Sequence, residues 1–334
     1  MSYGNNPYRR RRNFDISVSP STTYAGEARA EIMSAAVSSG DTLANGWVNQ
    51  IDGIHHKAVV STLNAADTIQ AAACSFDDGA NLTLGEKVLT LSDLKVNEEI
   101  CRGTVYTTWQ GAATSRASTN AYTAELQNAI VAQVAAKTAE QVETIIWQGL
   151  DSSGTTIMEG LLGDGTAASE TDLDASPIGG CREVDFTAAP TATTVIAQIG
   201  SVYSGAAQNC PAVLTKSDIN IYLSPKTYAI YLQALAVAGG QGFLNQVSNQ
   251  AFNEVNYLGV PVRRCPGMFD DMVLLTYADN LKVGTNVGTD LTDVRYIPTY
   301  EYDGSDNVRV VMQMGLGVQC ITPGDVVLGT TLWT

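Results

Sequence analysis

The segment from Tyr257 to Gly284 constrains the fold more than any other part of the chain. It reads YLGVPVRRCPGM, then an acidic turn FDD, then MVLLTYADNLKVG. Runs of β-branched residues and leucines, bounded by Gly, Pro, Asn and Asp, predict three strands separated by two turns, the second of them tight at Asp279-Asn280. Pro261 cannot donate a hydrogen bond to a neighbouring strand, so it places the first of these strands at a sheet edge.

A second segment near the C-terminal end predicts one long strand. Every second residue is apolar over 13 positions: Val308, Val310, Met312, Met314, Leu316, Val318 and Cys320. The residues between them are polar or small, apart from Val311. Alternation of this length is typical of a strand with one buried face. A Thr-Pro-Gly-Asp turn at 322–325 then leads into a short closing strand at 326–328.

Residues 120–149 have the clearest helical pattern. Apolar residues recur there at helical spacing, Asn120 offers an N-terminal cap, and Gly149 follows the end. A second helix is expected from Pro225, with Ser224 as its cap and an end at Gly239-Gly240. A strand at 218–223 precedes it, and a further helix is expected at 194–203.

Residues 52–102 predict a long β-hairpin. Its strands are His55 to Ala66 and Lys87 to Arg102, with a turn-rich segment at 76–81 between them. The apolar positions change phase at Asp93, which indicates a bulge or bend. An isolated hairpin of this size is marginal in water, so its apolar face is expected to lie on something.

The order and spacing of these elements resemble the major capsid protein of tailed double-stranded DNA bacteriophages, which has the Hong Kong 97-type fold. The matching features are a Gly-x-Pro-Val strand at 259–262, a Met-containing loop, an apolar strand and an Asn-centred turn. The long strand at 308–320 with its Pro-Gly turn matches the end of the family's P domain. The resemblance covers roughly the last 80 residues well and the rest by element order.

The resemblance implies an α+β fold with five parts. These are an N-terminal arm over 1–50, an E-loop hairpin over 51–103, a P domain over 104–190 with a spine helix at 120–149, an A domain over 191–294, and P-domain return strands over 295–334. In the family the E-loop lies across an adjacent subunit.

Charge is sparse and unevenly distributed. Charged residues make up 16% of the chain, below the usual ~25%, and such surfaces suit permanent subunit contacts. The net charge is −15, yet residues 9–12 are an uninterrupted basic run: Arg9, Arg10, Arg11 and Arg12. The rest of the chain repels nucleic acid while this short tail attracts it. The tail is therefore a candidate arm that contacts DNA phosphates non-specifically or carboxylates of a neighbouring subunit, with a merely solvated tail as the alternative.

No pattern of residues indicates an enzyme, a cofactor site or a metal site. His55 and His56, the two histidines of the chain, are expected on opposite faces of a strand and so unable to chelate together. The glycines at 239–242 follow a helix instead of opening one, as a phosphate cradle would require. Six widely spaced cysteines favour buried free thiols over a disulfide framework. The N-terminus lacks a secretory signal, and no apolar run is long enough to cross a membrane.

The resemblance implies a major capsid protein that assembles into pentamers and hexamers of an icosahedral shell around phage double-stranded DNA. The resemblance implies many copies of the chain itself as partners, with portal, scaffolding and decoration proteins beside them. It also implies assembly in the host cytoplasm and a final location in the virion. Two alternatives stay open, an encapsulin-like nanocompartment and a phage tail or surface binding protein.

Overall fold

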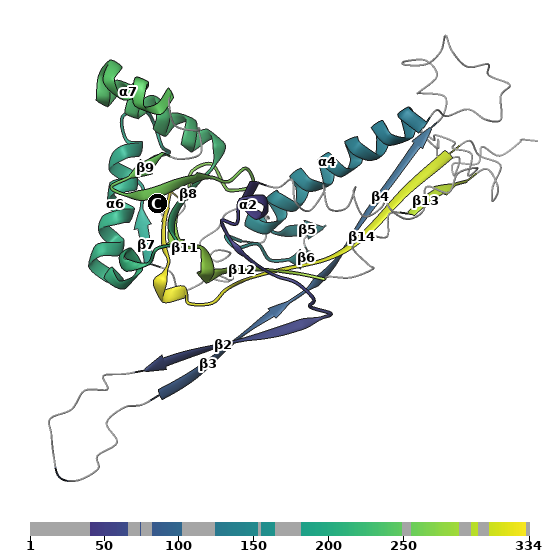
Figure 1. Cartoon of the computed structure of the whole chain (residues 1–334), viewed down its shortest axis with the longest axis horizontal. Helices are drawn as coiled ribbons and strands as arrows, with labels where there is room; N and C mark the ends of the chain where they lie inside the picture. Colours follow the sequence, from purple (N-terminus) through teal and green to yellow (C-terminus); the bar gives the residue numbers. More distant parts are fainter. Residues whose placement is uncertain are drawn as a thin grey trace, which may run out of the picture. The chain divides into compact units, whose positions relative to one another are not determined.

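The computed structural model describes residues 41–65, 74, 82–101, 124–152, 155–163, 182–248, 255–286, 295–299 and 307–331 (Figure 1). The chain divides into two compact units. The larger unit is built from residues 35–93, 136–287 and 315–334, and the smaller from 1–34, 94–135 and 288–314. Helix α4 (Ala124–Gln148) and strand β14 (Asn307–Cys320) each contribute residues to both units. Both elements were predicted from the sequence, and the structure confirms them.

A six-stranded mixed sheet organises the larger unit. Its strand order is β7-β15-β11-β8-β10-β9. The strands are β7 Arg182–Asp185, β15 Val327–Thr330, β11 Val273–Tyr277, β8 Ile219–Leu223, β10 Val260–Arg264 and β9 Asn256–Tyr257. Helices α6 (Val195–Asn209) and α7 (Pro225–Ser248) pack on this sheet, and their apolar side chains share one core with those of the strands. Short 3-10 turns η1 (Pro211–Thr215), η2 (Ala278–Asn280) and η3 (Pro323–Asp325) connect these elements.

Strand β8 is buried along its whole length because both of its faces are covered. Ile219, Ile221 and Leu223 belong to the core formed with α6 and α7. Tyr222, on the alternate face, lies against the indole ring of Trp147 in α4, with 5.6 Å between the ring centroids. Its hydroxyl donates a hydrogen bond to the carbonyl oxygen of Trp47 at 2.6 Å. The second face of the sheet therefore binds the end of α4 and the segment that follows α2 (Asp41–Ala44).

Two expectations, one about this sheet and one about helix α7, were wrong. Strand β10 lies between β8 and β9, not at the sheet edge, and Pro261 is tolerated because the pairing with β8 begins only at Val262. Helix α7 continues through Gly239-Gly240 to Ser248. Two glycines lower helix stability by about 1 kcal/mol each relative to alanine, which does not by itself end a helix, and no proline follows them.

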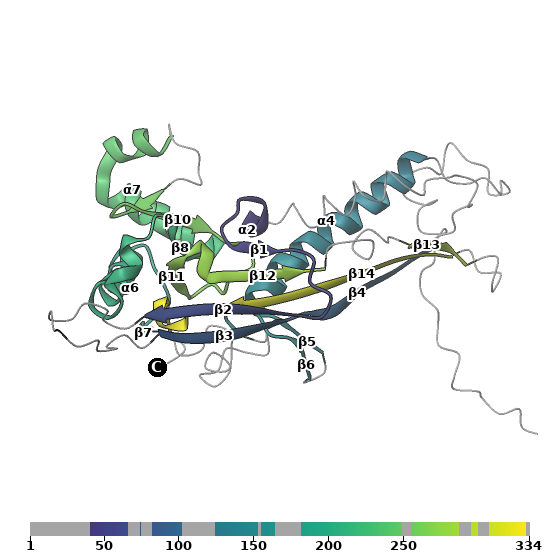
Figure 2. The same ribbon diagram turned by 60° about the horizontal axis from the view of Figure 1, so that its bottom comes forward.

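The predicted hairpin is present, but its second strand differs from the expected one. Strand β2 (Lys57–Ala65) pairs antiparallel with β3 (Leu82–Thr90), and Figures 1 and 2 show them as a two-stranded ribbon. The ladder ends at Thr90, and β4 (Ser92–Cys101) then pairs with β14 instead of β2. The phase change in the sequence near Asp93 marks this exchange of partners. The expected strand Lys87 to Arg102 therefore combines the end of β3 with β4.

The base of the ribbon packs against strands of the same unit. Strand β12 (Leu281–Thr285) pairs parallel with β1 (Asn49–Ile51) and antiparallel with the second half of β14. The side chains of Ile54, Leu89 and Leu91 form a small core there. A further short hairpin, β5 (Leu150–Ser152) and β6 (Thr155–Met158), follows α4.

Glycine at position 317 is required by a close approach of two backbones. A Cβ atom there would lie 2.2 Å from the carbonyl oxygen of Thr90, which cannot move without disturbing the ribbon base. We expect Gly317→Ala to lower the free energy of unfolding by about 1–3 kcal/mol, as overpacking does. Urea denaturation followed by circular dichroism measures this. Gly324→Ala is the matched control, because nothing lies within 4 Å of its added Cβ; equal effects of the two variants would contradict the close approach.

The smaller unit is held by the first half of β14. This half pairs antiparallel with β13 (Arg295–Pro298), and β4 also pairs with β14. Val310 and Met312 form its core with Val96 and Val134. The predicted alternation of β14 is confirmed, since the described even-numbered side chains from Val310 to Cys320 are buried. No helix among the described residues is long and apolar enough to span a membrane.

Candidate functional site

The ribbon of β2 and β3 carries an exposed apolar stripe on one face. Val59 lies opposite Val88, and Leu63 lies opposite Leu84. Their exposed fractions are 58%, 46%, 69% and 66%, respectively. Successive residues of a strand point to opposite faces, so these odd positions of β2 and even positions of β3 share one face. We call these four residues the ribbon stripe.

The ribbon stripe starts from a fixed base. Leu89 is fully buried, and a Cβ on Gly284 of β12 would lie 2.3 Å from its side chain. The backbone N–H of Leu91 donates to the carbonyl oxygen of His56 at 2.9 Å, which closes the ribbon at this end. The base thus fixes the direction of the two-stranded ribbon, and no described residue covers the ribbon stripe.

A surface hollow of about 390 Å³ adjoins the ribbon. It is lined by Val88, Thr90, Ser92, Thr156, Ile157, Met158, Glu159, Gly317, Val318 and Gln319. Ile157 is 41% exposed, so the apolar surface extends from Val88 of the stripe onto β6. Glu159 is the one titratable residue in this lining, which gives the hollow no pair of groups for acid–base catalysis.

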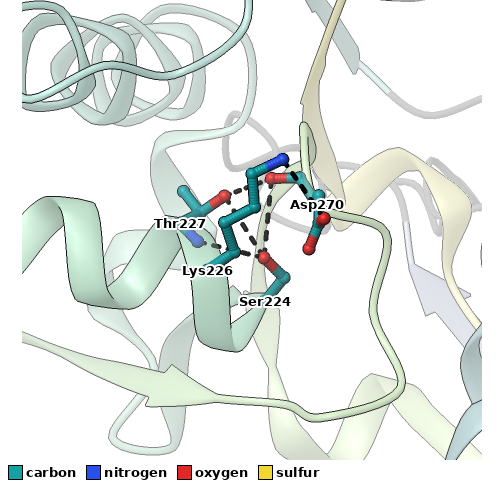
Figure 3. A network of polar contacts seen from close by, with 4 residues as sticks. All are labelled: Ser224, Lys226, Thr227 and Asp270. Carbon is teal, nitrogen blue, oxygen red and sulfur yellow. Dashed lines mark hydrogen bonds and ion pairs between the residues drawn. The ribbon is translucent and has the colours of Figure 1, made fainter.

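A polar network that resembles a catalytic constellation proves to be structural (Figure 3). The side-chain oxygen of Ser224 accepts the backbone N–H of Thr227 at 3.1 Å, which is the N-cap predicted from the sequence. The Thr227 hydroxyl donates to the carbonyl oxygen of Asp270, and Lys226 forms an ion pair with the Asp270 carboxylate at 3.3 Å. Ser224 is fully buried, so no substrate reaches its hydroxyl. The network fastens the start of α7 to the loop between β10 and β11.

Sequence reasoning missed a buried carboxylate near the end of α4. The side chain of Glu143 is 3% exposed and accepts two hydrogen bonds from Thr42, one from its hydroxyl and one from its backbone N–H at 3.3 Å. The Nε1 of Trp147 donates to the same hydroxyl oxygen at 3.1 Å. Burial raises the pKa of Glu143 above its ordinary value. The available signal was the position of Glu143 between Ala139 and Trp147, on the face of α4 that carries its buried apolar residues.

The candidate residues named from the sequence do not converge on one site. Arg9, Arg10, Arg11 and Arg12 lie outside the described residues. His55 and His56 are exposed in a bend ahead of β2, not on a strand as expected. The glycines at 239–242 lie inside α7, not in the loop expected there. Cys210, Cys265 and Cys320 are buried, as expected, whereas Cys74 is exposed.

Comparison with known proteins identifies the fold. No family model matches the chain, and no curated protein matches its sequence. Among solved structures, the capsid of a native GTA particle matches with a TM-score of 0.54 at 13% identity, covering 94% of this chain and 95% of that one. The satellite phage P4 procapsid, a structure that includes the size determination protein, matches with a TM-score of 0.52 at 13% identity, covering 94% and 93%. The capsid of Myoviridae phage XM1 gives 0.51 at 12% identity, covering 87% and 92%.

The chain has the phage capsid fold. The resemblance read from the sequence is therefore confirmed at the level of the fold, including its mixed helix-and-sheet class, and the Hong Kong 97-type architecture is consistent with it. Each of these matches covers at least 87% of this chain. The fold therefore extends well beyond the last 80 residues, which carried the resemblance best. The division into arm, E-loop, P domain and A domain stays a prediction.

Proposed function

We propose that this chain is a major capsid protein that assembles into pentamers and hexamers of an icosahedral shell enclosing phage double-stranded DNA. The observation that carries the proposal is the ribbon stripe on a chain with a capsid fold. Four apolar side chains in two cross-strand pairs face water in the single chain. Ser61 and Glu86 lie between the two pairs on the same face, and exposed apolar side chains bordered by polar ones in this way mark a site of protein contact.

The proposed occupant of the ribbon stripe is a second copy of the chain. A shell places many identical subunits side by side, so each ribbon has a neighbour within reach. Fully burying a Val or Leu side chain contributes about 1.5–3 kcal/mol, and each of these half-exposed ones would contribute roughly half of that. Such a contact is modest alone, but it is repeated at every subunit of a closed shell.

The other proposed partners are the packaged DNA and further components of the particle. We propose that the basic run at 9–12 touches packaged DNA without sequence preference, because the rest of the chain has a net charge of −19 and would not grip it. Portal, scaffolding and decoration proteins, assembly in the host cytoplasm and a location in the virion follow from the capsid proposal. The capsid structures that share this fold support a structural role for the chain.

The test is negative-stain electron microscopy of the purified chain, with size-exclusion chromatography on the same sample. We expect closed polyhedral shells, or rings of pentamer and hexamer size. Co-purifying DNA would support the genome container, whereas a co-purifying enzyme would favour the nanocompartment. A chain that stays monomeric on concentration would contradict assembly and favour a surface-binding role.

A further inference from the structure

The turn between strands β9 and β10 holds a leucine in a backbone conformation that leucine rarely adopts. Tyr257 pairs with Val260 across this hairpin, so Leu258 and Gly259 form its two-residue loop. Their φ angles are 49° and 89°, and two positive values are typical of a type I′ turn. Asparagine, aspartate or glycine usually fills the first of these positions, because a bulkier side chain crowds its own backbone there. Among the described residues, Leu258 is the one residue other than glycine with a positive φ.

The residues on either side of the turn fix its position. The ring of Tyr257 lies edge-on to that of Tyr203 in α6, with 6.1 Å between the ring centroids. A Cβ on Gly200 of the same helix would lie 2.8 Å from the Tyr257 hydroxyl, so this side chain fits closely against α6. The backbone N–H of Val262 donates to the carbonyl oxygen of Val255 at 2.7 Å. A strained conformation persists where its surroundings determine it in this way.

Leu258 gains nothing from its conformation within its own subunit. Its side chain is 70% exposed, and the core formed by the sheet with α6 and α7 includes Tyr257 but not Leu258. The other exposed large apolar side chains of the described residues are those of the ribbon stripe, Ile157 beside it and Val237 on α7. Leu258 is therefore not part of the ribbon stripe. A local rule broken without a gain inside the chain points to a use outside it.

We propose that Leu258 is the tip of a second subunit contact, separate from the ribbon stripe, and that its occupant is another copy of this chain. The inference rests on the proposed function and adds a contact that the ribbon cannot supply. A single kind of contact between identical subunits gives a dimer, a ring or a filament. A closed shell needs at least two kinds, and Leu258 supplies the second.

The surroundings of Leu258 suit a contact between identical chains. Two copies that each carry a net charge of −15 repel one another, so they meet at least cost where charge is absent. No charged residue occurs from 255 to 262, and none occurs in α6, on which Tyr257 packs. A partner recognised by complementary charge would find none to bind on these two segments.

Leu258→Asn tests the contact because it should move stability and assembly in opposite directions. Asparagine adopts the left-handed conformation more readily, so the unfolding constant of the unassembled subunit in urea should fall by about 5-fold. The apolar contact is lost, so the critical concentration for shell formation, followed by light scattering, should rise at least ~10-fold. Leu258→Met keeps an apolar side chain of similar size, and its critical concentration should stay within ~3-fold of that of the wild type.

The wild-type chain distinguishes a failure of this inference from a failure of the proposed function. Shells that form from Leu258→Asn at the wild-type critical concentration would overturn the contact with a second copy and leave a different protein as the occupant. A wild-type chain that forms no shell under any condition would contradict the proposed function, and the second contact with it.

Thiol labelling tests the same contact without relying on stability. Cys74 is exposed, so the background variant is Cys74→Ser. In that background Leu258→Cys introduces a thiol that should react with a maleimide in the unassembled subunit and lose this reactivity in shells. Peptide mass spectrometry locates the label at position 258. Equal labelling of subunits and shells at this position would overturn the proposal.

Discussion

Replacing Leu63 and Leu84 together by aspartate is expected to abolish shell assembly and to leave the subunit folded. The two residues face each other across the ribbon and are 69% and 66% exposed in the single chain. Substitutions at such positions change subunit stability by about 0.5 kcal/mol or less. In an assembled shell the same positions would be covered, and two unpaired carboxylates would then be buried at every contact. Each buried charge without a partner costs several kcal/mol, more than the leucine pair contributes.

The measurement is the fraction of protein in shells, by size-exclusion chromatography and negative-stain microscopy, beside the circular dichroism spectrum of the subunit. Thr83→Asp is the matched control, because Thr83 is exposed on the opposite face of the same strand. The conservative pair Leu63→Met and Leu84→Met should still assemble. Normal shells from the double aspartate variant would show that the ribbon stripe is not a subunit contact.

The ribbon also shows what the sequence could predict and what it could not. Apolar residues correctly indicated β2, the end of β3 and β14, whereas the first half of β3, which carries Leu84, was not predicted. The same pattern arises whether an apolar face is buried by the chain itself, as at Met312, or is exposed in the single chain, as at Leu63. Local periodicity carries no information about what covers a face. Only the three-dimensional arrangement separated the two cases.

The errors in the predicted elements have local physical causes. The change of phase near Asp93 was visible and predicted a bulge or bend within one hairpin, whereas it marks an exchange of partner strands after Thr90. Gly239-Gly240 was read as a helix end, although glycine only weakens a helix. The N-cap at Ser224 was predicted correctly because it depends on residues three positions apart.

The buried cluster at Glu143 illustrates the harder case. Thr42 and Glu143 are 101 residues apart, and neither belongs to a recognisable motif. A glutamate on a helix is usually solvated, so only its place among the buried residues of α4 distinguished it. Contacts of this kind depend on the packing of whole elements, which a single sequence does not reveal.

Replacing Trp147 by alanine is expected to destabilise the larger unit more than any other single substitution considered for it. The indole is fully buried, packs on the ring of Tyr222 at 5.6 Å and donates to the hydroxyl of Thr42 at 3.1 Å. Truncating a buried Trp to Ala costs about 3–5 kcal/mol through lost burial and the cavity left behind. The loss should lower the urea midpoint of the unassembled subunit, followed by far-UV circular dichroism.

Trp147→Phe separates packing from hydrogen bonding at this position. It keeps an aromatic ring against Tyr222 and removes the donor to Thr42, so a smaller loss of about 1–3 kcal/mol is expected. Val237→Ala, at a residue of α7 that is 79% exposed, should change stability by about 0.5 kcal/mol or less. If Trp147→Ala cost no more than this control, Trp147 would not join α4 to the sheet. An intermediate value for Trp147→Phe would instead show that the packed ring and the hydrogen bond to Thr42 both stabilise this contact between α4 and the segment around Thr42, which also donates to Glu143.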